Sequence, residues 1–523
     1  MTIRFVRWRT DGPRLRNPPE RRPYIQQLEQ TANTVGTEHF DVLIVGAGLS
    51  GVAAAYHLQT RCAAKSYAIL EARDAIGGTW DLFRYPGVRS DSDMFTLGYG
   101  FRPWPNAKSI ADGPAILSYV CETAHEYGID RKIRFGHRVR NASWSSADAL
   151  WTLEIDVGAG MPIVRYTCGF LYNCSGYYDY AAGYTPEWPD FDRYAGRIVH
   201  PQQWPEDLDY AGRQILIIGS GATAVTLAPE MAKTAAHVTI LQRSPTYIVA
   251  RPAVDTIAEW FQRRLPPRLA GSLMRWKNVL LGMYFYRLCR RKPERVKHGI
   301  VKLVRDALGP DYDVATHFTP TYNPWDQRLC LVPDADLFAA IRTGGVSFVT
   351  DQIERFTQTG VRLRSGKDLA ADVIVTATGL KMRLLGGIAL TVDGTPVELG
   401  KTLSYKGMMF SDVPNLASAF GYTNASWTLK CELIAKYVCR LLNYMDARGY
   451  AYCTPRRDPA IVEEATFGMT SGYILRAAAH LPKQGTRKPW KLYQNYLLDM
   501  ATLRFGKVTD PSMEFTRGVR VRR

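Results

Sequence analysis

The sequence predicts an α/β fold with two Rossmann-like dinucleotide-binding domains, because one pattern of strand, glycine-rich turn, helix and strand occurs twice. In the first copy, buried strands are expected over 41–45 and 66–70, on either side of the turn Gly46-Ala-Gly-Leu-Ser-Gly51 and its helix. In the second copy, the strands are expected over 214–218 and 237–241. The two copies are too diverged to be a tandem repeat, so we expect two domains with different ligands.

The first turn has the glycine spacing that holds a pyrophosphate. Gly46 allows the tight turn, Gly48 lets the backbone approach the pyrophosphate, and Gly51 lets the helix pack closely on the strand. The helix N-terminus then directs its partial positive charge toward the phosphates. Glu71, about 20 residues past Gly51, ends the second strand, where a carboxylate accepts hydrogen bonds from ribose hydroxyls. This site is therefore suited to FAD or NAD.

The second turn differs at the position that selects the nucleotide. The residues expected to hold its pyrophosphate are Gly219, Ser220, Gly221, Ala222, Thr223 and Ala224. After the second strand, Arg243 and Ser244 take the place of an acid. A carboxylate repels a ribose 2′-phosphate, whereas a guanidinium binds it with two hydrogen bonds. The second site is therefore predicted to prefer NADPH.

The order of these motifs predicts a first domain that is interrupted by the second. The expected parts are a basic, Pro-rich extension at 1–37, the FAD-binding domain at 38–190, the NADPH-binding domain at 191–370 with a helical insertion at 257–345, and the rest of the FAD-binding domain with a C-terminal tail at 371–523. The Pro-rich extension shows no sustained apolar period, which is typical of a segment outside the fold.

The composition is that of a globular protein with excess positive charge. The 523 residues are 46% hydrophobic and carry a formal net charge of +17. No zinc-finger spacing or RNA-binding aromatic pattern accompanies the charge, so we predict no nucleic-acid partner. The 9 cysteines contain no C-x-x-C and no metal-ligand spacing, so we predict no metal. The N-terminus lacks a signal-peptide pattern, and we expect a cytoplasmic protein.

Part of the charge lies in the segment 257–308, where many arginines and lysines alternate with Trp260, Trp276 and Tyr284. One interpretation is a solvated helix face whose long side chains cover apolar surface. The other is an amphipathic surface that lies peripherally on an anionic membrane. The sequence favours the first interpretation, and contact with a partner protein is a third, less expected one.

Two dinucleotide sites in one chain predict electron transfer between a flavin and a nicotinamide. A flavin disulfide reductase needs a redox pair of cysteines soon after Glu71, but the first cysteine after it is Cys121. Oxygen is then the simplest final electron acceptor.

Further motifs resemble the class B flavoprotein monooxygenases of the Baeyer–Villiger type. They are Gly77-Gly-Thr-Trp80, Arg84-Tyr-Pro-Gly87, Arg89-Ser-Asp91, and the segment 194–205, which follows the fingerprint F-x-G-x-x-x-H-x-x-x-W-P with Tyr194 in the Phe place. The segments 322–333 and 404–409 are most similar to the ethionamide-activating branch of that family. The resemblance covers about 38 to 510.

The resemblance implies roles for residues outside the two turns. It assigns FAD contacts to Ser50, Glu71, Thr79, Trp80, Asp81, Leu82, Asp91 and Val139. It places Arg89 and Ser90 near NADPH, and it matches Arg328 to the catalytic arginine, held by Asp91. Gln327 stands where many relatives have a lysine for the 2′-phosphate, which puts more of that task on Arg243. His200 is interpreted as a positioning residue.

The implied reaction begins with hydride transfer from NADPH to FAD, after which reduced FAD captures O2 as a C4a-peroxide. Attack on a small ketone then yields an ester or lactone, and Arg328 stabilises the anions. Two alternatives stay open. One is oxygenation of sulfur or nitrogen, including S-oxidation of thioamides or sulfides. The other is a protein that binds flavin and NADPH without oxygenase turnover.

Overall fold

The computed structural model describes residues 37–466 and 468–517. The predicted extension at 1–37 lies outside the described residues, apart from Thr37.

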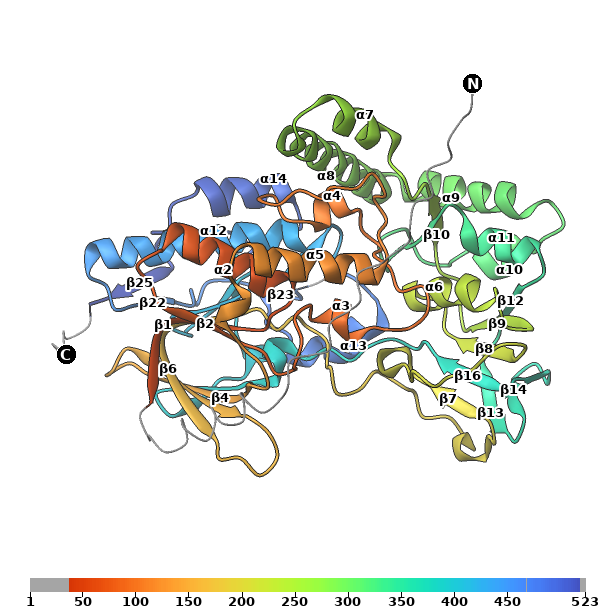
Figure 1. The fold of residues 1–523 in the computed structure, drawn as a ribbon, viewed down its shortest axis with the longest axis horizontal. Helices are drawn as coiled ribbons and strands as arrows, with labels where there is room; N and C mark the ends of the chain where they lie inside the picture. Colours follow the sequence, from red (N-terminus) through yellow and green to blue (C-terminus); the bar gives the residue numbers. More distant parts are fainter. Residues whose placement is uncertain (1–36, 467, 518–523) are drawn as a thin grey trace, which may run out of the picture. The chain divides into compact units, whose positions relative to one another are not determined.

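The first predicted pattern builds a large sheet (Figure 1). Two of its strands, β1 (Glu38–Val45) and β2 (Tyr67–Leu70), are parallel neighbours, with Val42 opposite Tyr67 and Val45 opposite Leu70. The strand order is β18-β17-β4-β5-β6-β1-β2-β3, and β21 also pairs with β6. The other members are β3 (Ile133–Arg134), β4 (Arg138–Ser145), β5 (Leu150–Asp156), β6 (Val164–Asn173), β17 (Ala389–Val392), β18 (Thr395–Pro396) and β21 (Leu416–Ser418).

Helices α2 (Leu49–Arg61), α5 (Gly113–Glu126) and α12 (Trp427–Arg448) lie together on one side of this sheet in Figure 1. The face of α2 is built from small residues, and Val52, Ala53 and Ala55 have no exposed surface. Small side chains bring the helix close to β1, which sets the N-terminus of α2 at the edge of the sheet where the glycine turn lies.

The second pattern forms a separate parallel sheet with the order β12-β9-β8-β16-β7. Its strands are β7 (Arg197–Val199), β8 (Gln214–Ile218), β9 (His237–Gln242), β12 (Val346–Thr350) and β16 (Val373–Thr376), and α6 (Ala222–Met231) follows β8. Between β12 and β16 the chain forms a small antiparallel sheet of β13 (Ile353–Thr357), β14 (Gly360–Leu363) and β15 (Asp368–Ala370).

The predicted boundary at 371 is wrong. β16 pairs in parallel with both β8 and β7, with Val373 opposite Ile215 and Arg197, so it completes the second sheet. The return to the first sheet comes later, at β17, which pairs with β4. The physical reason is that β16 is buried on both faces and fills the gap between β8 and β7.

The predicted helical insertion at 257–345 is mostly helical, but it also contains a strand. It contains α7 (Thr256–Arg264), α8 (Pro267–Arg291), α9 (Pro293–Leu308) and α10 (Val314–Phe318). The chain then forms β11 (Cys330–Pro333), parallel to β10 (Ile248–Arg251), followed by α11 (Asp336–Arg342). Within 37–466 and 468–517, none of the helices is both long enough and apolar enough to span a bilayer.

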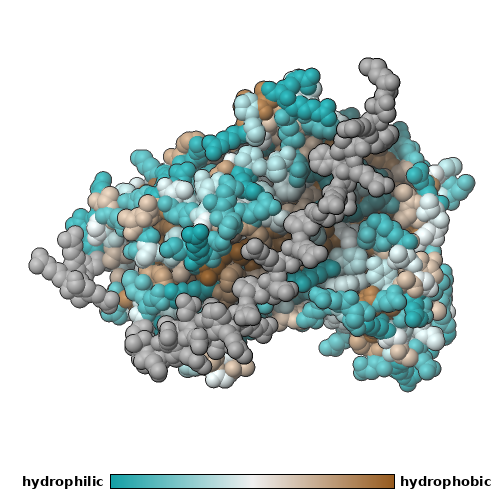
Figure 2. All heavy atoms as spheres, in the orientation of Figure 1, coloured by the Kyte–Doolittle hydropathy of each residue, from teal (hydrophilic) through white to brown (hydrophobic). Residues whose placement is uncertain are grey.

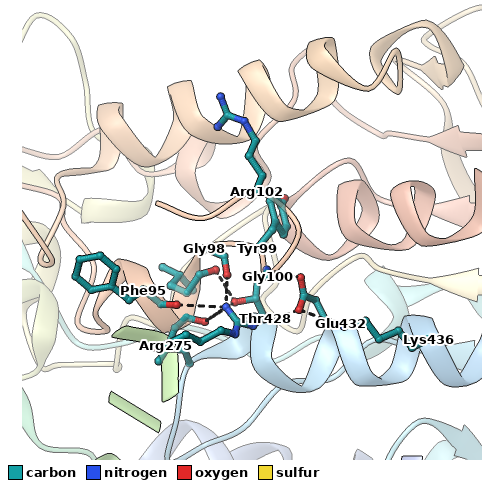
Figure 3. A network of polar contacts seen from close by, with 12 residues as sticks. Phe95, Gly98, Tyr99, Gly100, Arg102, Arg275, Thr428, Glu432 and Lys436 are labelled. Atoms are coloured by element: carbon teal, nitrogen blue, oxygen red, sulfur yellow. Dashed lines mark hydrogen bonds and ion pairs between the residues drawn. The ribbon is translucent and has the colours of Figure 1, made fainter. Parts of the chain in front are cut away.

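Arg275 anchors α8 to the segment 95–98 and to α12, as Figure 3 shows. Its guanidinium donates to the carbonyl oxygens of Phe95, Thr96 and Gly98, the last at 2.7 Å, and forms an ion pair of 3.2 Å with Glu432 on α12. The Arg275 and Glu432 side chains are only 12% and 5% exposed. Glu432 also accepts from the backbone N–H of Gly100 at 2.7 Å. The charges are buried but hydrogen-bonded, which makes the pair expensive to break.

Arg275→Ala is expected to destabilise the fold by about 3–5 kcal/mol, because it leaves the Glu432 carboxylate buried without its main counter-charge. The measurement is the midpoint of urea unfolding, followed by tryptophan fluorescence. Arg268→Ala, at an exposed position on the same helix, is the control and should change stability by less than about 0.5 kcal/mol. Equal midpoints for the two variants would contradict this account of the anchor.

Candidate functional site

The first glycine turn has backbone geometry that excludes other residues. Gly46 has φ +101°, and a Cβ there would lie 2.7 Å from the Cys174 carbonyl oxygen. A Cβ on Gly51 would lie 1.9 Å from the Gly46 carbonyl oxygen. The helix start and the strand end therefore touch through backbone atoms, and the backbone N–H groups at the start of α2 face the adjoining cavity.

Glu71 lies directly after β2 and is 6% exposed. Its carboxylate accepts from the backbone N–H of Ala47 at 2.7 Å and of Arg73 at 3.0 Å. Burial raises the pKa of Glu71, and these two amides oppose that shift. The carboxylate is therefore tied to the glycine turn, and it lines the cavity where a ribose would lie.

One long open cavity, which spans about 2480 Å³ including space open to solvent, runs along the glycine turns of both halves of the molecule, the half built on the first sheet and the half built on the second. It brings together most of the predicted residues: Gly46, Gly48, Ser50, Glu71, Thr79, Trp80, Leu82, Arg89, Ser90, Asp91, Val139, Ala222, Thr223 and Arg328. Thr79, Trp80 and Leu82 belong to the short helix α3 (Thr79–Leu82), and Val139 is on β4. Residues more than 200 positions apart in sequence thus share one wall.

Other predicted residues do not line this cavity: Gly51, Asp81, Gly219, Ser220, Gly221, Ala224, Arg243 and Ser244. The prediction that Asp81 contacts FAD is not supported by its position. Its buried carboxylate forms ion pairs with Arg73 at 2.5 Å and Arg84 at 3.1 Å, so it holds the loop that carries α3.

The second turn has the same backbone constraint as the first. A Cβ on Gly219, which has φ +125°, would lie 2.3 Å from the Ala377 carbonyl oxygen. Ala224, in the first turn of α6, is fully buried. Arg243 and Ser244 are exposed just after β9, outside the cavity but at the carboxyl edge of the second sheet. That edge is where dinucleotides bind in parallel sheets.

The catalytic pair of the prediction is present. Arg328 Nη1 lies 3.4 Å from Asp91 Oδ2, and the two side chains are 35% and 41% exposed. Arg328 comes from the insertion, just before β11, and Asp91 comes from the first half. Burial alone lowers the pKa of Arg328, but Tyr177 and then Asp91 outweigh it and raise that pKa above its ordinary value. Arg328 is therefore a permanent cation in the cavity wall.

A second ion pair joins the same two halves. Arg89 Nη1 forms a short ion pair with Asp336 Oδ2, and Arg89 Nη2 donates to Asp336 Oδ1 at 3.3 Å. Asp336 is the first residue of α11. Arg89 is only 14% exposed. The pair fixes the segment that also carries Ser90 and Asp91.

His200 and Tyr194 join the segments beside β7 and β16 and do not line the cavity. His200 Nε2 lies 3.2 Å from the Gly379 carbonyl oxygen, and its Nδ1 accepts from the Gln202 N–H at 3.2 Å. The Tyr194 hydroxyl donates to the Ala371 carbonyl oxygen at 2.9 Å, a contact that a Phe could not make. Both residues position the connection between the sheets.

Sequence reasoning missed several residues at this site. The hydroxyls of Tyr177 and Tyr178 lie 2.5 Å apart in the cavity wall, and burial raises the pKa of Tyr178 well above its usual range. Arg476, on α13 (Gly472–Ala477), stacks 3.5 Å over the Tyr184 ring at the same sheet edge as Arg243. No motif surrounds Arg476, and only the folded chain brings it to that edge.

The cavity fits two dinucleotides. Its wall carries buried polar atoms without a hydrogen-bond partner in the described residues: Arg89 Nε, Ser175 Oγ and Arg328 Nε. Buried polar atoms need partners, and the phosphates, hydroxyls and ring heteroatoms of FAD and NADPH supply them. The glycine turns leave room for backbone approach to a pyrophosphate on each half.

Two protein families match the chain. The NAD(P)-binding Rossmann-like domain matches residues 44–112. The flavin-binding monooxygenase-like family matches residues 113–262.

Named relatives and solved structures extend these matches. The chain is 55% identical over 483 residues to the FAD-containing monooxygenase EthA of Mycobacterium tuberculosis, covering 92% of this chain and 98% of that one. Its fold is similar to that of a steroid monooxygenase bound to NADP, with a TM-score of 0.71 and 20% identity over 92% of this chain and 100% of that chain. It is also similar to OTEMO in complex with FAD and NADP, with a TM-score of 0.65 and 22% identity over 80% of this chain and 88% of that chain. The last two likenesses confirm the predicted fold.

We predict that the enzyme prefers NADPH over NADH by at least about tenfold in KM, because a charge-assisted phosphate contact contributes roughly 1.5–3 kcal/mol. Arg243→Ala should erode this preference and leave FAD bound. Steady-state kinetics with both nucleotides, together with the flavin absorbance of the purified variant, measure the two effects. Equal use of the two nucleotides by the wild-type protein would refute the interpretation of Arg243.

Proposed function

The chain belongs to the FAD-containing monooxygenases, and on this premise we propose that it converts small ketones into esters or lactones with NADPH and O2. The overall reaction consumes one ketone, one O2, one NADPH and one proton, and it releases the ester, NADP⁺ and water. The observation that carries the proposal is the Arg328–Asp91 pair in the wall of a cavity that reaches both nucleotide turns.

In this proposal the first half binds FAD and the second half binds NADPH. Gly46, Gly48 and Glu71 hold the FAD pyrophosphate and ribose, and Gly219 to Ala224 form the turn for the NADPH pyrophosphate. When bound, reduced FAD supplies the oxygen-activating chemistry. The protein must orient the two cofactors and stabilise the negative charge that oxygen transfer creates.

Arg328 is the group suited to that charge. A guanidinium stays protonated, so it cannot act as a base, but it stabilises an oxyanion through charge and hydrogen bonds. Asp91 limits the movement of Arg328 through the 3.4 Å contact. The unpaired Arg328 Nε leaves a donor for the reacting oxygen atoms.

Oxidation of sulfur is the second candidate. The segment 322–333, which resembles the ethionamide-activating branch, carries Arg328 and ends in β11 beside the cavity. Thioamides and sulfides have no carbonyl oxyanion to stabilise, so we expect their oxidation to depend less on Arg328 than ketone oxidation does.

Arg328→Ala should keep its FAD and should still be reduced by NADPH without oxygen, because hydride transfer needs only the two cofactors in register. We expect ester formation to fall by at least about 10²–10³, the loss typical of one oxyanion donor. Oxygen consumed by the variant should appear as hydrogen peroxide. Stopped-flow flavin absorbance and mass spectrometry of products measure both steps. Arg328→Lys, which keeps a cation, is the control and should retain more product. Near wild-type ester formation by Arg328→Ala would remove Arg328 from the mechanism.

We also propose peripheral contact with an anionic membrane, through an apolar face on α7 and α8. This face consists of Ile257, Trp260, Leu269, Leu273, Trp276, Leu280 and Tyr284. On α8 the residues recur at intervals of three or four positions, so they form one stripe, and each is at least 36% exposed. Figure 2 shows brown, apolar atoms among hydrophilic ones at the top of the view, where Figure 1 places α7 and α8.

Positive charge surrounds this face. Arg263, Arg264, Arg268, Arg287 and Arg291 are exposed on the same two helices. An apolar stripe that inserts shallowly, with cations at its border, is the pattern of an interfacial helix on anionic lipid. The apolar stripe therefore favours the interfacial interpretation over a purely solvated helix face.

We predict salt-sensitive co-sedimentation with vesicles that contain anionic lipid, and none with neutral vesicles. Leu273→Asp should abolish this binding, because it places a carboxylate in the middle of the stripe. Val462→Asp, at a position that is 65% exposed on another part of the chain, is the matched control and should bind like wild type. Binding that ignores both salt and lipid charge would overturn the proposal.

A further inference from the structure

A second hollow, lined by cations, lies between α12 and the last helical segment of the chain. That segment consists of α14 (Tyr496–Asp499) and the π-helical turn η7 (Met500–Phe505). The hollow spans about 540 Å³, including space open to solvent, and is lined by Arg61, Lys436, Arg440, Arg504 and Phe505. None of these residues lines the dinucleotide cavity. We call it the basic hollow.

Two of its arginines are held by uncharged partners. The Arg440 guanidinium donates to the carbonyl oxygens of Leu503, Arg504 and Gly506 at 2.7–2.9 Å. Arg61 Nε donates to His57 Nδ1 at 3.4 Å. Burial lowers the pKa of His57 to about 4, so this imidazole is neutral at physiological pH. The positions of these cations are thus set in advance, without a counter-charge.

The carboxylate of Glu432, which contacts Lys436 of this cluster, also forms an ion pair with Arg275 outside it. Glu432, Lys436 and Arg440 stand at intervals of four residues on α12, so they lie along one face of the helix. Glu432 lies 3.8 Å from Lys436 but only 3.2 Å from Arg275, as Figure 3 shows for this end of the network. Burial lowers the pKa of Lys436, Glu432 opposes this, and the nearby arginines add to it. One carboxylate cannot neutralise this set of cations.

The surroundings of the basic hollow indicate which anion fits. Phe505 lies on its rim with 68% of its surface exposed, and Leu497 and Leu498 on α14 are 37% and 42% exposed. The Tyr496 ring, next to Leu497, lies 5.9 Å from the Trp276 ring of the apolar face on α8. This ring contact places α14, which leads into η7 and the basic hollow, against the apolar face on α8.

We propose that the basic hollow binds the phosphate of an anionic phospholipid whose acyl chains contact the apolar rim. Guanidinium groups bind phosphate oxygens with paired, charge-assisted hydrogen bonds. A free phosphate gains nothing from the exposed Phe505 at the rim or from the exposed leucines of the adjoining α14, whereas a lipid buries them. The inference rests on the proposed membrane contact, and it adds a specific headgroup site to the general attraction of α7 and α8.

The test uses two reversals of charge in the hollow, Arg61→Glu and Arg504→Glu. Arg440 is left intact because it holds η7. The matched control is Arg342→Glu, which makes the same change at an exposed position on α11, in the second half of the chain. The probes are phosphatidylcholine vesicles with and without phosphatidylglycerol, dihexanoyl phosphatidylglycerol below its micelle concentration, and inorganic phosphate. Calorimetry with the FAD-loaded enzyme measures the binding of the soluble probes.

We expect each hollow variant to bind phosphatidylglycerol vesicles at least about tenfold more weakly than wild type, with Arg342→Glu close to wild type. Dihexanoyl phosphatidylglycerol should bind wild type and neither hollow variant. Turnover of a small soluble ketone should be the same in all four proteins, which separates this site from the catalytic proposal.

Three results would overturn the proposal. If Arg342→Glu weakened vesicle binding as much as the hollow variants do, binding would depend only on the net charge of the protein. Wild-type lipid binding by both hollow variants would place the headgroup elsewhere. Inorganic phosphate binding as tightly as dihexanoyl phosphatidylglycerol would mean that the site takes free phosphate and not lipid. If the soluble lipid binds and the vesicles do not, the headgroup site stands and the apolar face on α7 and α8 is refuted.

Discussion

The site depends on reciprocal ion pairs between two halves that each bind a dinucleotide. Arg89 of the first half reaches Asp336 of the second, and Arg328 of the second half reaches Asp91 of the first. Because Arg89 and Asp91 are two residues apart, both pairs act on one short segment. That segment lines the cavity between the nucleotide turns, so the ion pairs fix where Arg328, the proposed catalytic cation, lies in the cavity wall.

The parts of this arrangement that rest on local backbone chemistry could be predicted from sequence. A turn such as Gly46 to Gly51 admits few alternatives, because a Cβ at either end would collide with backbone carbonyls. The absence of an acid after β9, with Arg243 in its place, is also a local signal. The predicted fold followed from these motifs, and the likeness to solved structures confirms it.

The parts that rest on tertiary contacts could not be predicted in the same way. The predicted domain boundary at 371 was wrong because the sequence of a buried strand such as β16 does not show which of the two sheets the strand joins. Only its pairing with β8 and β7 assigns it to the second sheet. Asp81 carries a family motif but turns its carboxylate to Arg73 and Arg84. Arg476 lies on the short helix α13 and comes close to Arg243, at the sheet edge proposed for NADPH. No sequence motif marks Arg476.

The residues behind the net charge of +17 are concentrated in more than one region of this structure. Arg243 and Arg476 face the edge where the NADPH phosphates are proposed to bind, while the arginines of α7 and α8 border an apolar face. The basic hollow concentrates further cations around uncharged partners. Charge in each place is combined with a different second feature, and that combination distinguishes the proposed nucleotide site from the proposed lipid surface.

The central claim is that the Arg328 charge acts from a position that Asp91 holds. Asp91→Asn tests it most directly, because it keeps the shape and removes the charge. The measurement is the fraction of oxidised NADPH that ends in oxygenated product and not in hydrogen peroxide. This account predicts anaerobic flavin reduction at the wild-type rate and a clear fall in that fraction. An unchanged fraction would show that the ion pair is dispensable and would contradict the account.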